Sequence, residues 1–153
     1  MKQIVIILIL LPLGLMAQKE NSGVAPGASV AYAEEVGINL RFHYFPNHQV
    51  CFGIETNIFP QSGERFSNNQ EITLNGHYIF PFSEHWGVYP IGGIGWKKHE
   101  EESGFRALTG LGLHGTFEHV QPYVEYIYGS GFQSEGILLV GTFITIQFGK
   151  HGE

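Results

Sequence analysis

Acyl-transfer and hydrolytic chemistry need a serine or cysteine nucleophile with a histidine placed to take its proton. The clearest candidate nucleophile is Ser130, in the segment YIYGSG, and the sequence places no histidine beside it. His99 and the acidic residues 100–102 form a separate polar stretch. We therefore expect no catalytic residues and no enzymatic activity.

Histidine and cysteine could also act as metal ligands. His48, His85, His119 and His151 all fall at one end of the predicted fold. They are spread around that end, too far apart to share an ion whose bonds to nitrogen are about 2.0–2.1 Å long. Cys51 has no second cysteine to pair with, so we expect a small buried residue rather than a disulfide. The sequence thus predicts no metal site and no cofactor.

The segment WGVYPIGGIGW, from Trp86 to Trp96, indicates the size of the elements that position these residues. Ten residues of β-strand span about 33 Å, and a tilt of about 40° reduces this to roughly 25 Å, the height of the apolar band of an outer-membrane barrel. Tryptophan favours the two membrane–water interfaces. No charged residue stands between the two tryptophans on their shared face. The segment therefore predicts a membrane-crossing strand.

The rest of the chain repeats this pattern without the period of a helix. Eight strand-like runs cover residues 27–33, 35–45, 49–59, 70–80, 86–97, 105–117, 120–129 and 136–148. Most exceed the 5–6 residues of an average globular strand and match the roughly 9–11 that a membrane-crossing strand needs. Short connections alternate with longer polar ones at residues 60–69, 98–104 and 130–135. This alternation predicts periplasmic turns at one end and external loops at the other.

The two faces of these runs differ in polarity. One face carries no charged or amide side chain and ends in a predicted aromatic girdle, which comprises Tyr44, Phe80, Trp86, Trp96, Tyr126, Tyr128 and Phe148. A charge that faces lipid costs about 2–4 kcal/mol at mid-membrane, and lipid satisfies no free strand edge. We therefore predict an all-β, eight-stranded antiparallel up-and-down transmembrane β-barrel, with this apolar face outward.

The polar face would then fill the lumen, which in an eight-stranded barrel is just wide enough for side chains. The expected turns place Arg41 opposite Glu55, and His114 opposite Glu125. We predict a plugged interior in which Arg41, Glu55, Glu125 and Arg106 form one network. Structural filling is the favoured role of this network, and a gate for small ions is the alternative.

The remaining segments have simpler interpretations. Residues 1–17 have a positive start, an apolar centre and small residues before the predicted cleavage site, as in a secretory signal peptide. Residues 18–26 are predicted to be a flexible tail, residues 27–148 the barrel and residues 149–153 a short periplasmic tail. The net charge is −6 and the 8 lysines and arginines do not cluster, which argues against binding of nucleic acid.

Several stretches resemble the small outer-membrane β-barrel family of Bacteroidetes, itself similar to OmpA/OmpX-type barrels. They are GINLRFHYFPNHQVCFGIETNIF, ITLNGHYIFPFSEHWGVYPIGGIGW, HVQPYVEYIYGSGF and GTFITIQF. The resemblance implies residence in the outer membrane, among its lipid and lipopolysaccharide. A closing strand that ends in Phe148 resembles the signal read by the barrel-assembly machinery, although here five residues follow it.

These observations favour a structural or surface-interaction role with a filled lumen, and they name no partner protein. The alternatives are a narrow porin-like channel, an outer-membrane enzyme that modifies lipid A, or a secreted lipocalin-like binding barrel. The last of these would have its apolar face inside and its charged face in water.

Overall fold

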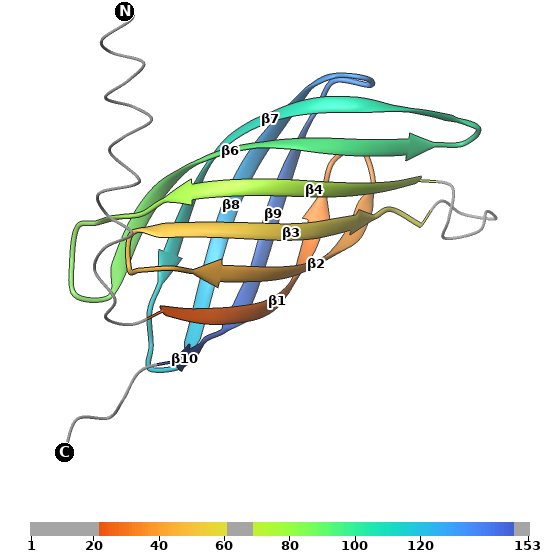
Figure 1. The fold of residues 1–153 in the computed structure, drawn as a ribbon. Coiled ribbons are helices and arrows are strands. Elements are labelled where there is room, and N and C mark those ends of the chain that lie inside the picture. The colour runs from red at the N-terminus through yellow and green to blue at the C-terminus, as the bar shows by residue number, and fades with distance from the viewer. Residues whose placement is uncertain (1–21, 61–68, 149–153) are drawn as a thin grey trace, which may run out of the picture.

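The computed structural model describes residues 22–60 and 69–148, which form one antiparallel sheet. Its strand segments are β1 (Ser22–Tyr32), β2 (Val36–Phe45), β3 (Val50–Ile58), β4 (Asn69–Tyr78), β5 (Phe80–Pro81), β6 (Trp86–His99), β7 (Glu102–Gly115), β8 (Val120–Gly131), β9 (Glu135–Ile144) and β10 (Ile146–Phe148). β1 pairs with β2 on one side and with β9 and β10 on the other, which closes the sheet into a barrel (Figure 1). These residues include no helix that is long and apolar enough to cross a membrane.

The ten segments make eight spans, because two spans are interrupted at a single residue. β5 continues β4 in the same register against β6, and β10 continues β9 in the same register against β1. At the two interruptions, the amides of Ile79 and Thr145 still donate to neighbouring carbonyls, at 2.7 and 2.8 Å. The predicted closed, eight-stranded antiparallel up-and-down barrel is confirmed.

Side chains alternate between the outside and the inside of this barrel, as β-strand geometry requires. Leu40 and Ile54 are 50% and 51% exposed, whereas Arg41 and Glu55, their neighbours in the chain, are 4% and 2% exposed. All seven residues of the predicted aromatic girdle lie on the exposed face. The apolar face is therefore outside and the charged face inside, which is the reverse of a lipocalin-like barrel.

The two ends of the barrel differ in what they carry. The terminal end holds Ser22 and Phe148, which pair with each other, and the turns at residues 46–49, 82–85 and 116–119. The far end holds the connections at residues 33–35, 100–101 and 132–134. Trp86 lies at the terminal end and Trp96 towards the far end. Tyr126 pairs with Leu111 and Leu138, so it lies further from either end than a girdle residue should.

The first strand begins five residues earlier than the sequence predicts. Residues 22–26 were predicted to be part of a flexible tail, but residues 23–26 pair with β2 and residues 22–24 pair with β10. Gly23 and Pro26 are poor strand formers, but pairing partners override that local preference. The predicted signal peptide (1–17) and periplasmic tail (149–153) lie outside the described residues.

Two of the predicted long loops are also corrected. β6 runs to His99 and β7 starts at Glu102, so the loop predicted at residues 98–104 is a two-residue turn, with Glu100 at φ 54°. The loop predicted at 130–135 shrinks to residues 132–134. At this end, polar residues continue the strand pairing beyond the apolar band. Because they are polar, the sequence alone indicated loops. The middle of the third loop, residues 61–68, lies outside the described residues.

Candidate functional site

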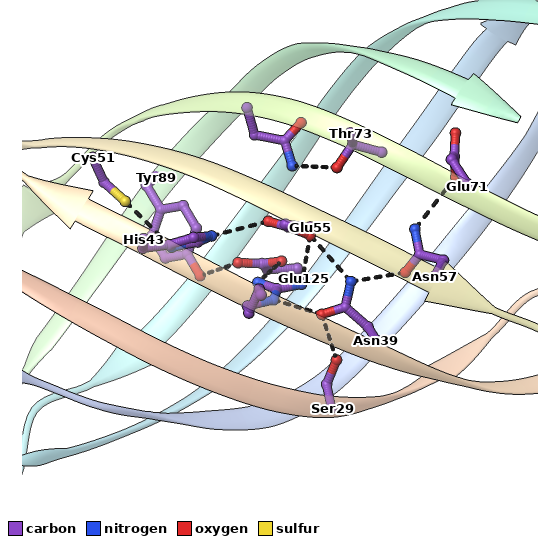
Figure 2. Close-up of polar contacts among 12 residues, drawn as sticks. Ser29, Asn39, His43, Cys51, Glu55, Asn57, Glu71, Thr73, Tyr89 and Glu125 are labelled. Carbon is purple, nitrogen blue, oxygen red and sulfur yellow. Dashed lines mark hydrogen bonds and ion pairs between the residues drawn. The ribbon is translucent and has the colours of Figure 1, made fainter.

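A buried ion cluster crosses the middle of the lumen (Figure 2). Arg41 contacts Glu55 at 3.1 Å and Glu125 at 2.7 Å, and all three side chains are at most 1% exposed. Tyr89 donates a hydrogen bond to the second oxygen of Glu125 at 2.7 Å. The guanidinium carbon of Arg41 also lies 4.4 Å from the centre of the Tyr123 ring. We call Arg41, Glu55 and Glu125 the central triad.

The strand arrangement explains why these groups meet. Arg41 and Glu55 are direct cross-strand partners on β2 and β3, as the sequence predicted. Glu125 comes from β8, three strands away from β2 in the other direction around the barrel, and Arg41 and Glu125 are both buried inside the barrel. Burial of a charge is costly unless it is paired, and the triad pairs both carboxylates with one guanidinium.

A second ion cluster lies nearer the far end. Arg106 of β7 contacts Glu71 at 3.2 Å and Glu135 at 3.1 Å, and Lys97 forms a further ion pair with Glu135. Arg106 also donates to the carbonyl of Gly129 at 3.3 Å. A Cβ at Gly129 would lie 2.0 Å from the guanidinium, so only glycine leaves room for Arg106 here.

Arg106 joins the predicted network with Arg41, Glu55 and Glu125, but only indirectly, because its own ion pairs are with Glu71 and Glu135. Arg106 pairs in register with Gly131, at the end of β8, and its side chain lies too close to the far end to meet Glu55 or Glu125. Two asparagine side chains link the clusters, beginning with Asn39, which donates to Glu55 at 3.2 Å. Asn39 donates to Asn57 at 2.8 Å, and Asn57 donates to Glu71 at 3.3 Å.

His114 was predicted to lie opposite Glu125, and this pairing is wrong. His114 pairs with Tyr123, and Gly112 stands opposite Glu125. The turn explains the difference, because Phe117 and Val120 pair directly across a two-residue turn and shift the register by two residues. The His114 ring lies 5.4 Å from that of Tyr89 instead.

A third group, which the sequence analysis missed, lies between the central triad and the terminal end. His43, Cys51 and His77 are buried, and one ligand atom of each lies within 4.8 Å of the others. His43 Nδ1 is 3.3 Å from Cys51 Sγ, and His43 Nε2 is 3.0 Å from Glu55 Oε1. The available signal was the strand register, which places Cys51 opposite His77.

Cavities are found at both ends of the lumen. One of about 290 Å³ opens at the far end and is lined in part by Glu35, Lys97, His99 and Glu135. Another of about 210 Å³ lies at the terminal end. The buried central triad lies in the lumen between them. Ser130, the candidate nucleophile, lies on the exposed surface, where its hydroxyl donates to the carbonyl of Ala107 at 3.3 Å.

No protein-family model matches the chain, and no curated protein matches it. Among solved structures, the chain is similar to the N-terminal β-barrel domain of Pseudomonas aeruginosa OprF, with a TM-score of 0.67, 16% identity and coverage of 84% of this chain and 100% of that one. It is also similar to a de novo designed transmembrane β-barrel, with a TM-score of 0.65, 12% identity and coverage of 81% and 95%.

A further match is Ail, the attachment invasion locus protein of Yersinia pestis, in complex with the heparin analogue sucrose octasulfate. Here the TM-score is 0.58, the identity 16% and the coverage 83% of this chain and 99% of that one. Ail has also been solved as an outer membrane protein in a phospholipid bilayer nanodisc. At these identities the likeness shows the fold, which is that of eight-stranded transmembrane β-barrels.

Proposed function

We propose that this chain is an integral outer-membrane β-barrel with a closed lumen, and that it acts through the surface of its far end. The observation that carries the proposal is the central triad. Arg41 joins Glu55 and Glu125 across the lumen, and none of the three side chains is more than 1% exposed. A lumen crossed by such a triad fits a structural plug better than an open pore.

The outer surface supports the membrane location. Large apolar side chains that range from 39% to 75% exposed cover it, including Ile54, Leu111 and Val140. Exposure of so large an apolar surface to water is unfavourable, whereas its contact with lipid is not. The fold match to Ail, solved in a lipid bilayer, agrees with this location.

The far end suggests the kind of surface that the protein meets. Its described connections and strand ends carry carboxylates at Glu34, Glu35 and residues 100–102, against Lys97 and Lys98. Ail was solved with a sulfated heparin analogue, but an acidic end would repel such a polyanion. We therefore propose contact with the surrounding lipopolysaccharide through bridging divalent cations, with lipid around the barrel wall.

The motifs quoted above support three accompanying proposals. The chain enters the periplasm by a cleaved signal peptide at residues 1–17, and the barrel-assembly machinery inserts it. Its place among the small barrels of Bacteroidetes is proposed on the same residue patterns.

Two measurements on the mature protein test the main proposal. An unboiled sample should migrate differently from a boiled one on a denaturing gel, because closed membrane barrels resist detergent until heated. Planar-bilayer recording should show no large, steady conductance from the wild-type protein, whereas truncation of the triad in Arg41→Ala/Glu55→Ala/Glu125→Ala should raise it. Identical migration would refute the barrel in membranes, and a steady wild-type conductance would refute the closed lumen.

A further inference from the structure

We propose that His43, Cys51 and His77 form a binding site for one zinc ion inside the barrel. Their three ligand atoms lie within 4.8 Å of one another, and all three residues are buried. A cysteine thiolate and neutral imidazoles are ligands that Zn²⁺ prefers in proteins. Nothing in the proposed surface role depends on this site.

The strand register builds the site from three adjacent strands. Cys51 on β3 stands directly opposite His77 on β4. His43 on β2 stands opposite Gly53, the next inward-facing position from Cys51. A Cβ at Gly53 would lie 2.4 Å from the His43 ring, so glycine allows this imidazole to lie across β3. The ring thereby reaches Cys51, with Nδ1 at 3.3 Å from Sγ.

The outer contacts of both histidines suit metal binding. His43 Nε2 lies 3.0 Å from Glu55 Oε1, so donation to this carboxylate leaves the lone pair of Nδ1 directed at Cys51. Carboxylates orient metal-binding histidines in this way in known sites. The His77 ring is stacked on Tyr89, with centres 5.2 Å apart and planes 10° apart.

His77 provides an observation independent of the clustering. It is 6% exposed, and its Nε2 atom is buried with no hydrogen-bond partner among the described residues. A buried nitrogen without a partner is unfavourable, because it has lost its bonds to water. Coordination of a metal ion would satisfy it.

The space around the three residues is large enough for a single ion and adjoins a cavity through which an ion can enter. They line a cavity of about 10 Å³, close to the room that one water needs. This cavity shares Phe45, Ile79, His114 and Gln121 with the 210 Å³ cavity at the terminal end. An ion can therefore enter from that end, and water can occupy its fourth coordination position.

The geometry is close to that of a bound state. Zinc bonds of about 2.0–2.3 Å place the ligand atoms of a tetrahedral site about 3.3–3.8 Å apart. The pair formed by His43 and Cys51 already meets this, at 3.3 Å, and the other ligand atoms, which lie within 4.8 Å of one another, need to approach by at most about 1.5 Å. Binding forms the Zn–S bond as the Cys51 thiol loses its proton to the buffer, while both histidines bind as neutral rings.

Calorimetric titration with zinc chloride tests the proposal on the folded, full-length barrel in detergent, after treatment with a chelator. We expect one zinc ion per chain and, from titrations in two buffers of different ionisation enthalpy, release of one proton. Cobalt chloride should produce the charge-transfer absorption of a thiolate–cobalt bond. Each sample is checked for the folded, heat-modifiable form on a gel.

Three variants separate this site from surface histidines. Cys51→Ser and His77→Ala should each weaken zinc binding by more than the roughly 10–100-fold that loss of an outer partner costs, and Cys51→Ser should abolish the cobalt band. His119→Ala, in an exposed turn, should bind zinc as the wild type does. Wild-type affinity in Cys51→Ser would overturn the proposal. If that variant does not fold, the absence of the cobalt band or of proton release in the wild type overturns it equally.

Discussion

Arg41 and Glu125 meet across the barrel at 2.7 Å, although they lie 84 residues apart in the chain. Arg41 also contacts Glu55 at 3.1 Å, so a single cation is paired with two buried carboxyl groups. This arrangement makes the three residues energetically dependent on one another. Loss of the cation would leave two negative charges facing each other in a space that holds little water.

Replacement of Arg41 should therefore be the most damaging change in the triad. Arg41→Met should lower the free energy of unfolding by about 3–5 kcal/mol, because it strands two buried carboxylates. The triple variant Arg41→Met/Glu55→Gln/Glu125→Gln should lose less, because it removes all three charges. Urea titration of the barrel in lipid vesicles measures both. If the triple variant is no more stable than Arg41→Met, unpaired buried charge is not the cause of the loss of stability.

The sequence predicted the faces of the barrel well, because strand alternation depends only on local pattern. It placed Arg41 opposite Glu55 correctly, since the turn between β2 and β3 is short and symmetric. It also placed Glu125 of β8 in one network with Arg41, because both lie on the polar face, but it gave no direct contact between them, since that contact depends on closure of the barrel. The predicted pairing of His114 with Glu125 was wrong for a different reason. The centre of the turn was misplaced by one residue, and such an error shifts every cross-strand partner by two residues.

The same limit explains the missed cluster of His43, Cys51 and His77. The sequence shows histidines in the turns at one end of the barrel, but those turns are spread around the rim. His43, Cys51 and His77 meet because β2, β3 and β4 place their inward-facing positions side by side. To predict this cluster, one must know the register of both strand pairs.

Close packing of Tyr89 gives a second prediction. A Cβ at Gly112 would lie 2.3 Å from the Tyr89 ring, which is held by its hydrogen bond to Glu125. Gly112→Ala should therefore destabilise the barrel by about 1–3 kcal/mol, the usual cost of overpacking. Gly92→Ala is the matched control, because a Cβ there meets no described atom within 4 Å. Its folding free energy should stay the same or improve by about 0.4–1 kcal/mol. Equal losses in the two variants would contradict this account.

The depth of a residue in the apolar band gives a third prediction. Leu111 is 63% exposed and pairs with Pro90, which lies between the two tryptophans of β6. Ile144 is 57% exposed but pairs with Val120, the first residue of β8, at the terminal end. Leu111→Arg should cost about 2–4 kcal/mol in bilayers, and Ile144→Arg about 0–1 kcal/mol. Folding titrations in vesicles measure the two costs, and the reverse order would show that the band is centred elsewhere.

The orientation of the barrel in the membrane gives the last prediction. The eight spans bring Ser22 and Phe148 to one end, with the turn at residues 82–85, and leave the turn at 100–101 at the other. The longest connection, residues 59–68 between β3 and β4, lies at the far end. Outer-membrane barrels place their longer loops outside, so the far end should face outward. Glu101→Cys should react with a membrane-impermeant maleimide in intact cells, whereas Ser83→Cys should react only after the outer membrane is permeabilised. The native Cys51 is 1% exposed, so it should stay unlabelled and give a clean background. Labelling of Ser83→Cys alone in intact cells would invert the orientation, and the acidic far end could then not meet lipopolysaccharide.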